Sequence, residues 1–412
     1  MENTKSLRER VIAGLEERRD RILNGDINCI PLPFKRFRSE LPGIEQEVYF
    51  LISGGTKSAK TRLVNYLFVY NTIMYAYYNQ NKINPKIFYY PLEETPEAIT
   101  LRFMSYLLST LSKKRISPTD LRSTDSDNPV SEEILNLLKS EEYTKILDYY
   151  EKSVVFMSSR NPTGVWKDIK SYADNHGKVH TKTCKYKDEF GVEHTGEQFD
   201  YYEPDNPNEY VFIIVDHVSL LETERGLTLR ECINKLSEYM VIVRNRYRYI
   251  PVVVQQQSVE TTNLEAFKNN KIRPTSSGLS DSKGPSKDCS IMLGITNPFS
   301  YDLPIYLGYN LQRLKGNFRC LEIVLNRNGN SNGICPLFFD GVTGRFKELP
   351  LPDNKEGMDL VYKELEKIRN TKQISTNKSF FAYKLNKKEK KLHNKFIISK
   401  FAALFSKITK KY

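Results

Sequence analysis

The sequence is poor in the residues that build metal centres and disulfide frameworks. Six cysteines are spread over 412 residues without a C-x-x-C pair, which excludes a zinc ribbon and a disulfide-stapled secreted domain. There are only five histidines. The four metal-capable residues that fall close together are His176, His180, Cys184 and His194, and their spacing matches no standard zinc site. We therefore interpret residues 176–209 as a polar β-hairpin insertion, with metal binding as the alternative.

Long apolar runs are also lacking. No run approaches the roughly 18 residues that a membrane-spanning helix needs, so no membrane span is expected. The first residues, Met-Glu-Asn-Thr-Lys, lack the apolar core of a signal peptide. Together with the scattered cysteines, these absences predict a cytoplasmic protein with reduced thiols.

Acidic residues are outnumbered by basic ones, 50 against 62, which gives a net charge of +12. This balance favours a polyanionic partner, although a generally basic host composition would produce it too. Much of the excess lies beyond residue 384, where ten lysines face the single acid Glu389. One side of this tail is apolar, which suits a partner protein, a membrane surface, a nucleic acid or a solvated end; its residues are Ile397, Phe401, Leu404, Phe405 and Ile408.

One stretch, residues 48–61, carries the clearest chemistry. An apolar strand runs into a glycine pair, closes on Lys-Thr and continues as a helix, which is the context of a phosphate-binding P-loop. Backbone N–H groups would cradle phosphates, Lys60 would reach the β- and γ-phosphates, and Thr61 would hold Mg²⁺. The predicted nucleotide-binding residues are Gly54, Gly55, Thr56, Lys57, Ser58, Ala59, Lys60, Thr61 and Arg62. The alternative is a strand–loop–helix corner that happens to contain Lys-Thr.

The P-loop pattern has one departure, because Ala59 replaces its last glycine. A methyl group is harmless at this position if the backbone φ angle is negative. It is costly if φ is positive, since only glycine adopts that region freely.

Strands and helices alternate along the chain, which favours an α/β fold with a mostly parallel central sheet flanked by helices. Strands are expected at residues 86–94, 153–157, 211–216, 250–257, 290–295, 320–325 and 334–339. Helices are expected at residues 5–24, 62–68, 98–111, 164–175, 227–247 and 353–373. Ligands of such sheets bind at the carboxyl ends of the strands.

Polar residues with suitable chemistry follow these strands. Asp216 would complete the Mg²⁺ site, and Glu93 would position or polarise the attacking water. Gln256 would sense the nucleotide, although the triplet 255–257 leaves the register open. Arg327 would stabilise the transferred phosphoryl group from a neighbouring subunit. Each residue also has a structural alternative, such as a carboxylate favoured at a helix start or an arginine that holds a turn.

Taken together, these motifs resemble the C-terminal motor domain of DnaB-type replicative helicases, which are RecA-like P-loop ATPases. Residues 91–97 resemble the family's S-L-E-M-S-P-E segment, whose Glu is the catalytic base. Residues 214–221 resemble its Walker B run, and residues 252–258 its sensor strand. Asn326-Arg327-Asn328-Gly329 is similar to the K-x-R-N-G arginine-finger hairpin, except that Leu325 replaces the lysine.

The resemblance implies a domain plan and a mechanism. Residues 1–40 would be a linker helix and connector, 41–350 the ATPase core, and 351–412 a basic C-terminal extension. Subunits would form a ring, most often a hexamer, that binds ATP and Mg²⁺ at its interfaces and single-stranded DNA in its channel. The DNA-binding loops would fall within residues 258–288, with contacts from Ser282, Lys283 and Gly284.

The family's N-terminal domain is missing from this sequence, which is typical of bacteriophage forms and would place the protein in a host cytoplasm. Resemblance implies 5′ to 3′ unwinding of a replication fork, with a primase or loading protein as further partners. Two alternatives remain open. One is a RecA-like ATPase of another class, such as a recombinase, and the other is a nucleotide-gated DNA loader or scaffold with little turnover.

Overall fold

The structure is a computed structural model that describes residues 6–258, 272–331 and 333–369. The chain divides into two compact units, Met1–Thr124 with Pro129–Leu349 and Asp125–Asn128 with Pro350–Tyr412. In the smaller unit, residues 355–369 form a helix. The lysine-rich tail beyond residue 384 and its apolar stripe lie outside the described residues. No helix in the described ranges combines the length and apolarity needed to cross a bilayer.

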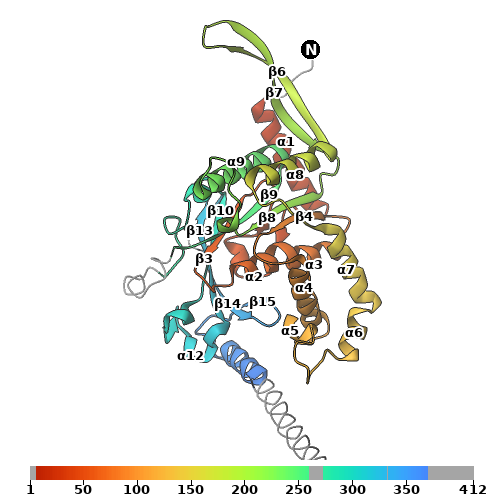
Figure 1. Cartoon of the computed structure of the whole chain (residues 1–412), viewed down its shortest axis with the longest axis vertical. Coiled ribbons are helices and arrows are strands. Elements are labelled where there is room, and N and C mark those ends of the chain that lie inside the picture. Colours follow the sequence, from red (N-terminus) through yellow and green to blue (C-terminus); the bar gives the residue numbers. More distant parts are fainter. Residues whose placement is uncertain (1–5, 259–271, 332, 370–412) are drawn as a thin grey trace, which may run out of the picture. The chain divides into compact units, whose positions relative to one another are not determined.

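A nine-stranded sheet forms the centre of the larger unit (Figure 1). Six neighbouring strands are parallel and three antiparallel strands complete one end. Its order is β15 (Arg345–Glu348), β14 (Ile334–Asp340), β13 (Phe318–Asn326), β10 (Ile291–Thr296), β3 (Phe50–Gly54), β9 (Ile250–Gln256), β8 (Glu209–Asp216), β4 (Asn84–Pro91) and β5 (Val154–Phe156). The predicted α/β class with a mostly parallel sheet is confirmed.

The central strands are buried on both faces, which explains their continuous apolar sequences. In β8, every residue from Tyr210 to Asp216 is buried. The register places Gly54 beside Gln256 and Pro91 beside Asp216. The residues that follow these strands therefore gather at one edge of the sheet, where the sequence predicts the site.

Helices cover both faces of the sheet and create two hydrophobic cores. Alternation along β3 sends Phe50 and Ile52 into one core, and Tyr49 and Leu51 into the other. The first core is closed by α2 (Lys60–Val64), η2 (Asn65–Tyr70), α3 (Asn71–Tyr77), α4 (Pro96–Leu111), α6 (Glu132–Leu138) and α7 (Glu141–Ser153). The second is closed by α8 (Pro162–Asn175) and α9 (Leu229–Tyr247).

The helix after the P-loop is longer and less regular than expected. Its middle section, η2, is a π-helix whose six residues are all buried. The wider π turn places Tyr66, Phe68 and Tyr70 within one core, where Tyr70 stacks on Tyr106 with ring centroids 4.8 Å apart. Aromatic packing against the sheet therefore decides the local helix type.

The strand predicted at residues 86–94 ends earlier, at Pro91. The chain bends here because the N–H of Leu92 bonds the carbonyl of Asp216 on the neighbouring strand. Thr95 then caps α4 by accepting a hydrogen bond from the N–H of Ala98, as its sequence predicts. Glu93 consequently lies in the bend between strand and helix rather than in the strand.

The insertion at residues 176–209 is a hairpin of two long strands, β6 (Gly177–Lys187) and β7 (Glu193–Pro204), and this prediction is confirmed. It projects away from the sheet at the same end of the unit as α1 (Leu7–Leu23) (Figure 1). The helix α1 begins at a capping box formed by Ser6 and Glu9. Its apolar residues remain largely exposed, 54% for Val11 and 64% for Leu15.

Short elements connect these parts. They are β1 (Ile30–Pro31), η1 (Phe37–Ser39), β2 (Gly43–Ile44), α5 (Pro118–Leu121), η3 (Val218–Leu220), α11 (Gly284–Asp288), η5 (Pro298–Tyr301), β11 (Ile305–Tyr306), β12 (Tyr309–Asn310), α12 (Leu311–Leu314) and η6 (Lys315–Asn317).

Candidate nucleotide-binding site

The loop between β3 and α2 has the tight geometry of a phosphate cradle. A Cβ atom at Gly54 would lie 2.3 Å from the carbonyl oxygen of Ile295, so only glycine fits beside β10 at this point. Two later residues, Lys57 and Ala59, have φ angles of 60° and 79°. Ala59 therefore occupies the left-handed region, and its methyl group is the costly case rather than the harmless one.

Lys60 stands at the first position of α2 with its side chain directed back across the loop. Its Nζ donates to the carbonyl oxygen of Gly55 at 3.0 Å. Burial lowers the pKa of Lys60 to about 8, partly opposed by the nearby carboxylates of Asp216 and Glu93. A buried cation without a salt-bridged anion among the described residues has a strong electrostatic preference for an anionic ligand.

The P-loop and β8 meet through Thr61 and Asp216. The Thr61 hydroxyl donates to Oδ1 of Asp216 at 3.1 Å, and the hydroxyl of Tyr89 donates to Oδ2 at 3.2 Å. Burial raises the pKa of Asp216 to about 6, although both hydrogen bonds favour the ionised form. The two predicted Mg²⁺ ligands are thus brought together from positions 155 residues apart.

Glu93 approaches the same edge from the bend after β4. Its side chain is 55% exposed and lies 3.8 Å from Nε2 of His217. Burial lowers the pKa of His217, which favours the neutral imidazole beside the carboxylate. The adjacent Glu94 turns away and pairs with Arg102 on α4. Of the two neighbouring acids, only Glu93 is therefore free of a salt bridge to arginine within the described residues.

Three glutamines at the end of β9 point in alternate directions. Gln255 donates to the carbonyl of Ser282 at 2.7 Å, and Gln257 donates to the hydroxyl of Ser53 at 2.8 Å. Gln256 lies opposite Gly54 in the register, on the face that bears the P-loop helix. Its role as the sensor stays a prediction, and Gln257 is the glutamine that contacts β3.

Arg327 lies far from the P-loop of its own chain. The register aligns Asn326 with Ile291 on β10, and Ile291 with Phe50 at the start of β3. The P-loop follows the other end of β3. In its own subunit, Arg327 donates through Nε to the carbonyl of Cys289 at 2.9 Å. A role at a phosphoryl group therefore requires a second copy of the chain.

The three residues expected to contact DNA differ in their surroundings. Ser282 is buried and donates to Oδ1 of Asn234. Gly284 fits tightly, because an added Cβ would lie 2.2 Å from the same oxygen. Only Lys283 presents an exposed side chain. Most of the expected DNA-binding segment, residues 259–271, lies outside the described residues, and the DNA contacts stay predictions.

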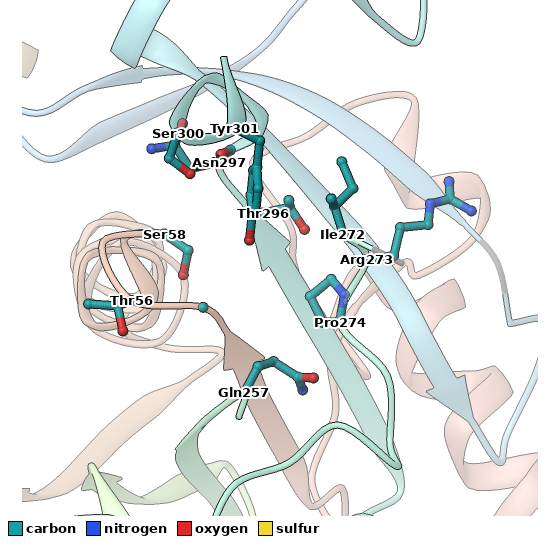
Figure 2. Close-up of a pocket in the computed structure, with 11 residues that line it drawn as sticks. Thr56, Ser58, Gln257, Ile272, Arg273, Pro274, Thr296, Asn297, Ser300 and Tyr301 are labelled. Carbon is teal, nitrogen blue, oxygen red and sulfur yellow. Dashed lines mark hydrogen bonds between the residues drawn. The ribbon is translucent and has the colours of Figure 1, made fainter. Parts of the chain in front are cut away.

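A narrow polar pocket borders the other side of the P-loop, and the sequence did not point to it. Figure 2 shows Thr56 and Ser58 on one wall, facing Thr296 and Tyr301 from the segment that ends β10. The hydroxyl oxygens of Ser58 and Thr296 are buried and have no hydrogen-bond partner in the described structure. The pocket thus offers two unsatisfied polar groups directly beside the phosphate loop.

A second feature missed by the sequence is the buried guanidinium of Arg319. Its Nε donates to the carbonyl oxygen of Ser58 at 2.9 Å, and its plane lies over the ring of Phe339. Burial lowers the pKa of Arg319 to about 10. An arginine between Phe318 and Cys320 at the start of a buried strand is the signal that could have identified this support of the P-loop.

Comparison with known proteins gives a result at the level of the fold. No protein-family model matches the sequence, and no curated protein matches it. One solved structure, that of a helicase ATPase domain, aligns with a TM-score of 0.55 at 15% identity, over 84% of this chain and 100% of that chain. The chain has the fold of a DnaB-type helicase ATPase domain.

A second structure with this DnaB-type fold, "The Structure Of A DnaB-Like Replicative Helicase And Its Interactions With Primase", aligns with a TM-score of 0.56 at 15% identity. The alignment covers 84% of this chain and 67% of that chain. The RecA-like architecture expected from the motifs is confirmed.

Proposed function

We propose that this chain is an ATP-hydrolysing motor of the replicative-helicase type. The observation that carries the proposal is the contact between Thr61 of the P-loop and Asp216 of β8. It joins a phosphate-binding loop to a strand-end carboxylate at the edge where a DnaB-type fold has room for a nucleotide. The fold alone would fit many activities, but these side chains are specific to nucleotide chemistry.

The residues present fit ATP and Mg²⁺. Lys60 is a buried cation that would pair with phosphate, and the backbone of residues 54–59 would supply N–H donors. Thr61 and Asp216 would hold Mg²⁺, because hydroxyl and carboxylate oxygens are its preferred ligands. Bound Mg²⁺ would neutralise phosphate charge, and it would also relieve the burial of the Asp216 carboxylate.

Glu93 would then act as the general base. Its exposed carboxylate at the sheet edge can accept a proton from water beside the terminal phosphate. Arg327 of a second copy would stabilise the developing charge, since it lies at the opposite edge in its own subunit. The ATP site would therefore form between subunits, with single-stranded DNA as the track and 5′ to 3′ as the direction.

The test measures ATP hydrolysis with and without single-stranded DNA, alongside strand displacement. We expect Lys60→Ala to abolish MgATP binding, and Glu93→Gln to lower turnover at least a hundredfold while preserving binding. The matched control is Glu94→Gln, which removes the adjacent acid and should hydrolyse ATP at the wild-type rate. Normal turnover by Lys60→Ala or Glu93→Gln would refute the site.

Strand displacement separates the remaining alternatives. A recombinase-type ATPase would hydrolyse ATP on DNA without unwinding a fork, and a scaffold would bind ATP with little turnover. The strained Ala59 is the observation that keeps the scaffold alternative in the test.

A further inference from the structure

The hairpin of β6 and β7 is not explained by ATP hydrolysis. Its strands contain 11 and 12 residues, and most of their side chains are exposed. Within the described chain they form a separate two-stranded sheet, so both outer edges are open. Two-stranded sheets in water are marginally stable, and open edges readily pair with further strands.

The root of the hairpin is anchored to the core. Tyr202 of β7 is buried and contacts the ring of Tyr247 on α9, with centroids 5.1 Å apart. The guanidinium of Arg246 lies over the ring of Phe199. These contacts fix the direction in which the hairpin leaves the unit, so copies related by a rotation would present identical, equally oriented hairpins.

Charge is segregated between the two strands. The strand β6 contains no acid, and its four basic residues are Lys178, Lys182, Lys185 and Lys187. The strand β7 contains no lysine or arginine, and its four acids are Glu193, Glu197, Asp200 and Glu203. One edge of the sheet is therefore basic and the other acidic.

Pairing within the hairpin uses only part of this charge. Lys182 lies 3.3 Å from Asp200, and Lys187 lies 3.9 Å from Glu193. Lys178 and Lys185 make no ion pair within the described residues. Lysines on an edge usually prevent strand pairing, but a matching row of acids on the opposite edge makes pairing between copies favourable.

Nucleic acid is a poor fit to this surface. Residues 177–204 contain four lysines and six acids, a net charge of −2, which repels a phosphate backbone. A second copy of the chain offers the complementary edge in the correct place. Because every copy has one basic and one acidic edge, contacts would run head to tail, as cyclic assemblies require.

We propose that β6 of one copy pairs with β7 of the next through their exposed edges. A rotation between copies places these strands antiparallel, so the pairing continues the pattern inside each hairpin. The inference rests on the proposed function only in assuming a cyclic assembly. It assigns the insertion a role in subunit assembly rather than in DNA contact.

The experiment uses charge reversal in the full-length chain, with assembly followed by light scattering across protein concentrations. One variant reverses β6 (K178E, K182E, K185E and K187E), a second reverses β7 (E193K, E197K, D200K and E203K), and a third carries both sets. Either single reversal should raise the concentration needed for assembly at least tenfold. Mixing the two should restore it, because each supplies the edge the other lacks.

The third variant is the matched control, since it keeps both internal and intermolecular complementarity and should assemble like the wild type. Single reversals that assemble normally, or a mixture that stays dissociated, would overturn the proposal. MgATP binding is measured on the same samples. Its loss in the wild type would count against the proposed function, whereas the hairpin result depends only on assembly.

Discussion

At the scale of the residue, Ala59 sets the chemistry of the loop. Its φ angle of 79° is one that glycine adopts freely and alanine adopts at a cost of roughly 1–2 kcal/mol. The loop nevertheless directs Lys60 and Thr61 toward the site. The chain therefore stores strain in the segment that must hold the phosphates.

Ala59→Gly should relieve this strain. We expect the free energy of unfolding to rise by about 1 kcal/mol, because the relief exceeds the roughly 0.4–1 kcal/mol that the added freedom of the unfolded chain removes. Urea unfolding of the variant and the wild type measures the difference. A variant that is clearly less stable would show that the methyl contact with the core outweighs the backbone strain.

At the scale of the element, β8 carries Asp216 to a buried position where its carboxylate is poorly solvated. The folded-state pKa of about 6 lies above the ordinary aspartate pKa of 3.8. Between these values the folded state binds a proton that the unfolded state does not, so stability falls as pH rises from about 4 to 6. Ionised Asp216 then costs on the order of 3 kcal/mol.

Asp216→Asn should remove this pH dependence, because the amide oxygen can still accept from Thr61 and Tyr89. Without Mg²⁺, the variant should be more stable than the wild type above pH 6, and the difference should vanish below about pH 4. Urea unfolding between about pH 4 and 8 measures it. A difference that does not change with pH would contradict the burial argument.

At the scale of the whole molecule, the site is complete only with a second copy. Arg327 and the P-loop lie at opposite edges of one sheet. A finger that acts across an interface and a P-loop that acts within one subunit can be separated by mixing defective chains.

Arg327→Ala should bind MgATP normally but fail to hydrolyse it. Mixed with Lys60→Ala, which is also inactive alone, it should recover part of the activity, because some interfaces combine an intact Lys60 with an intact Arg327. Steady-state ATPase assays of the single and mixed preparations measure this. A mixture that stays inactive would argue against an interface site.

The sequence by itself determined the nucleotide chemistry and the layered architecture. Local patterns are sufficient here, because a P-loop lies within one strand–loop–helix unit and apolar runs ending in Asp216 identify a buried strand. The polar hairpin at 176–209 was predictable for the same reason, as its strands pair with neighbours in sequence.

Only the tertiary structure decided the features that depend on distant contacts. The sign of φ at Ala59 follows from the close approach of β3 to β10, and Arg319 reaches Ser58 from 261 residues away. The three glutamines differ only in which face of β9 they occupy, which the sheet register fixes. Such choices follow from packing between segments far apart in the chain, and no local pattern contains that information.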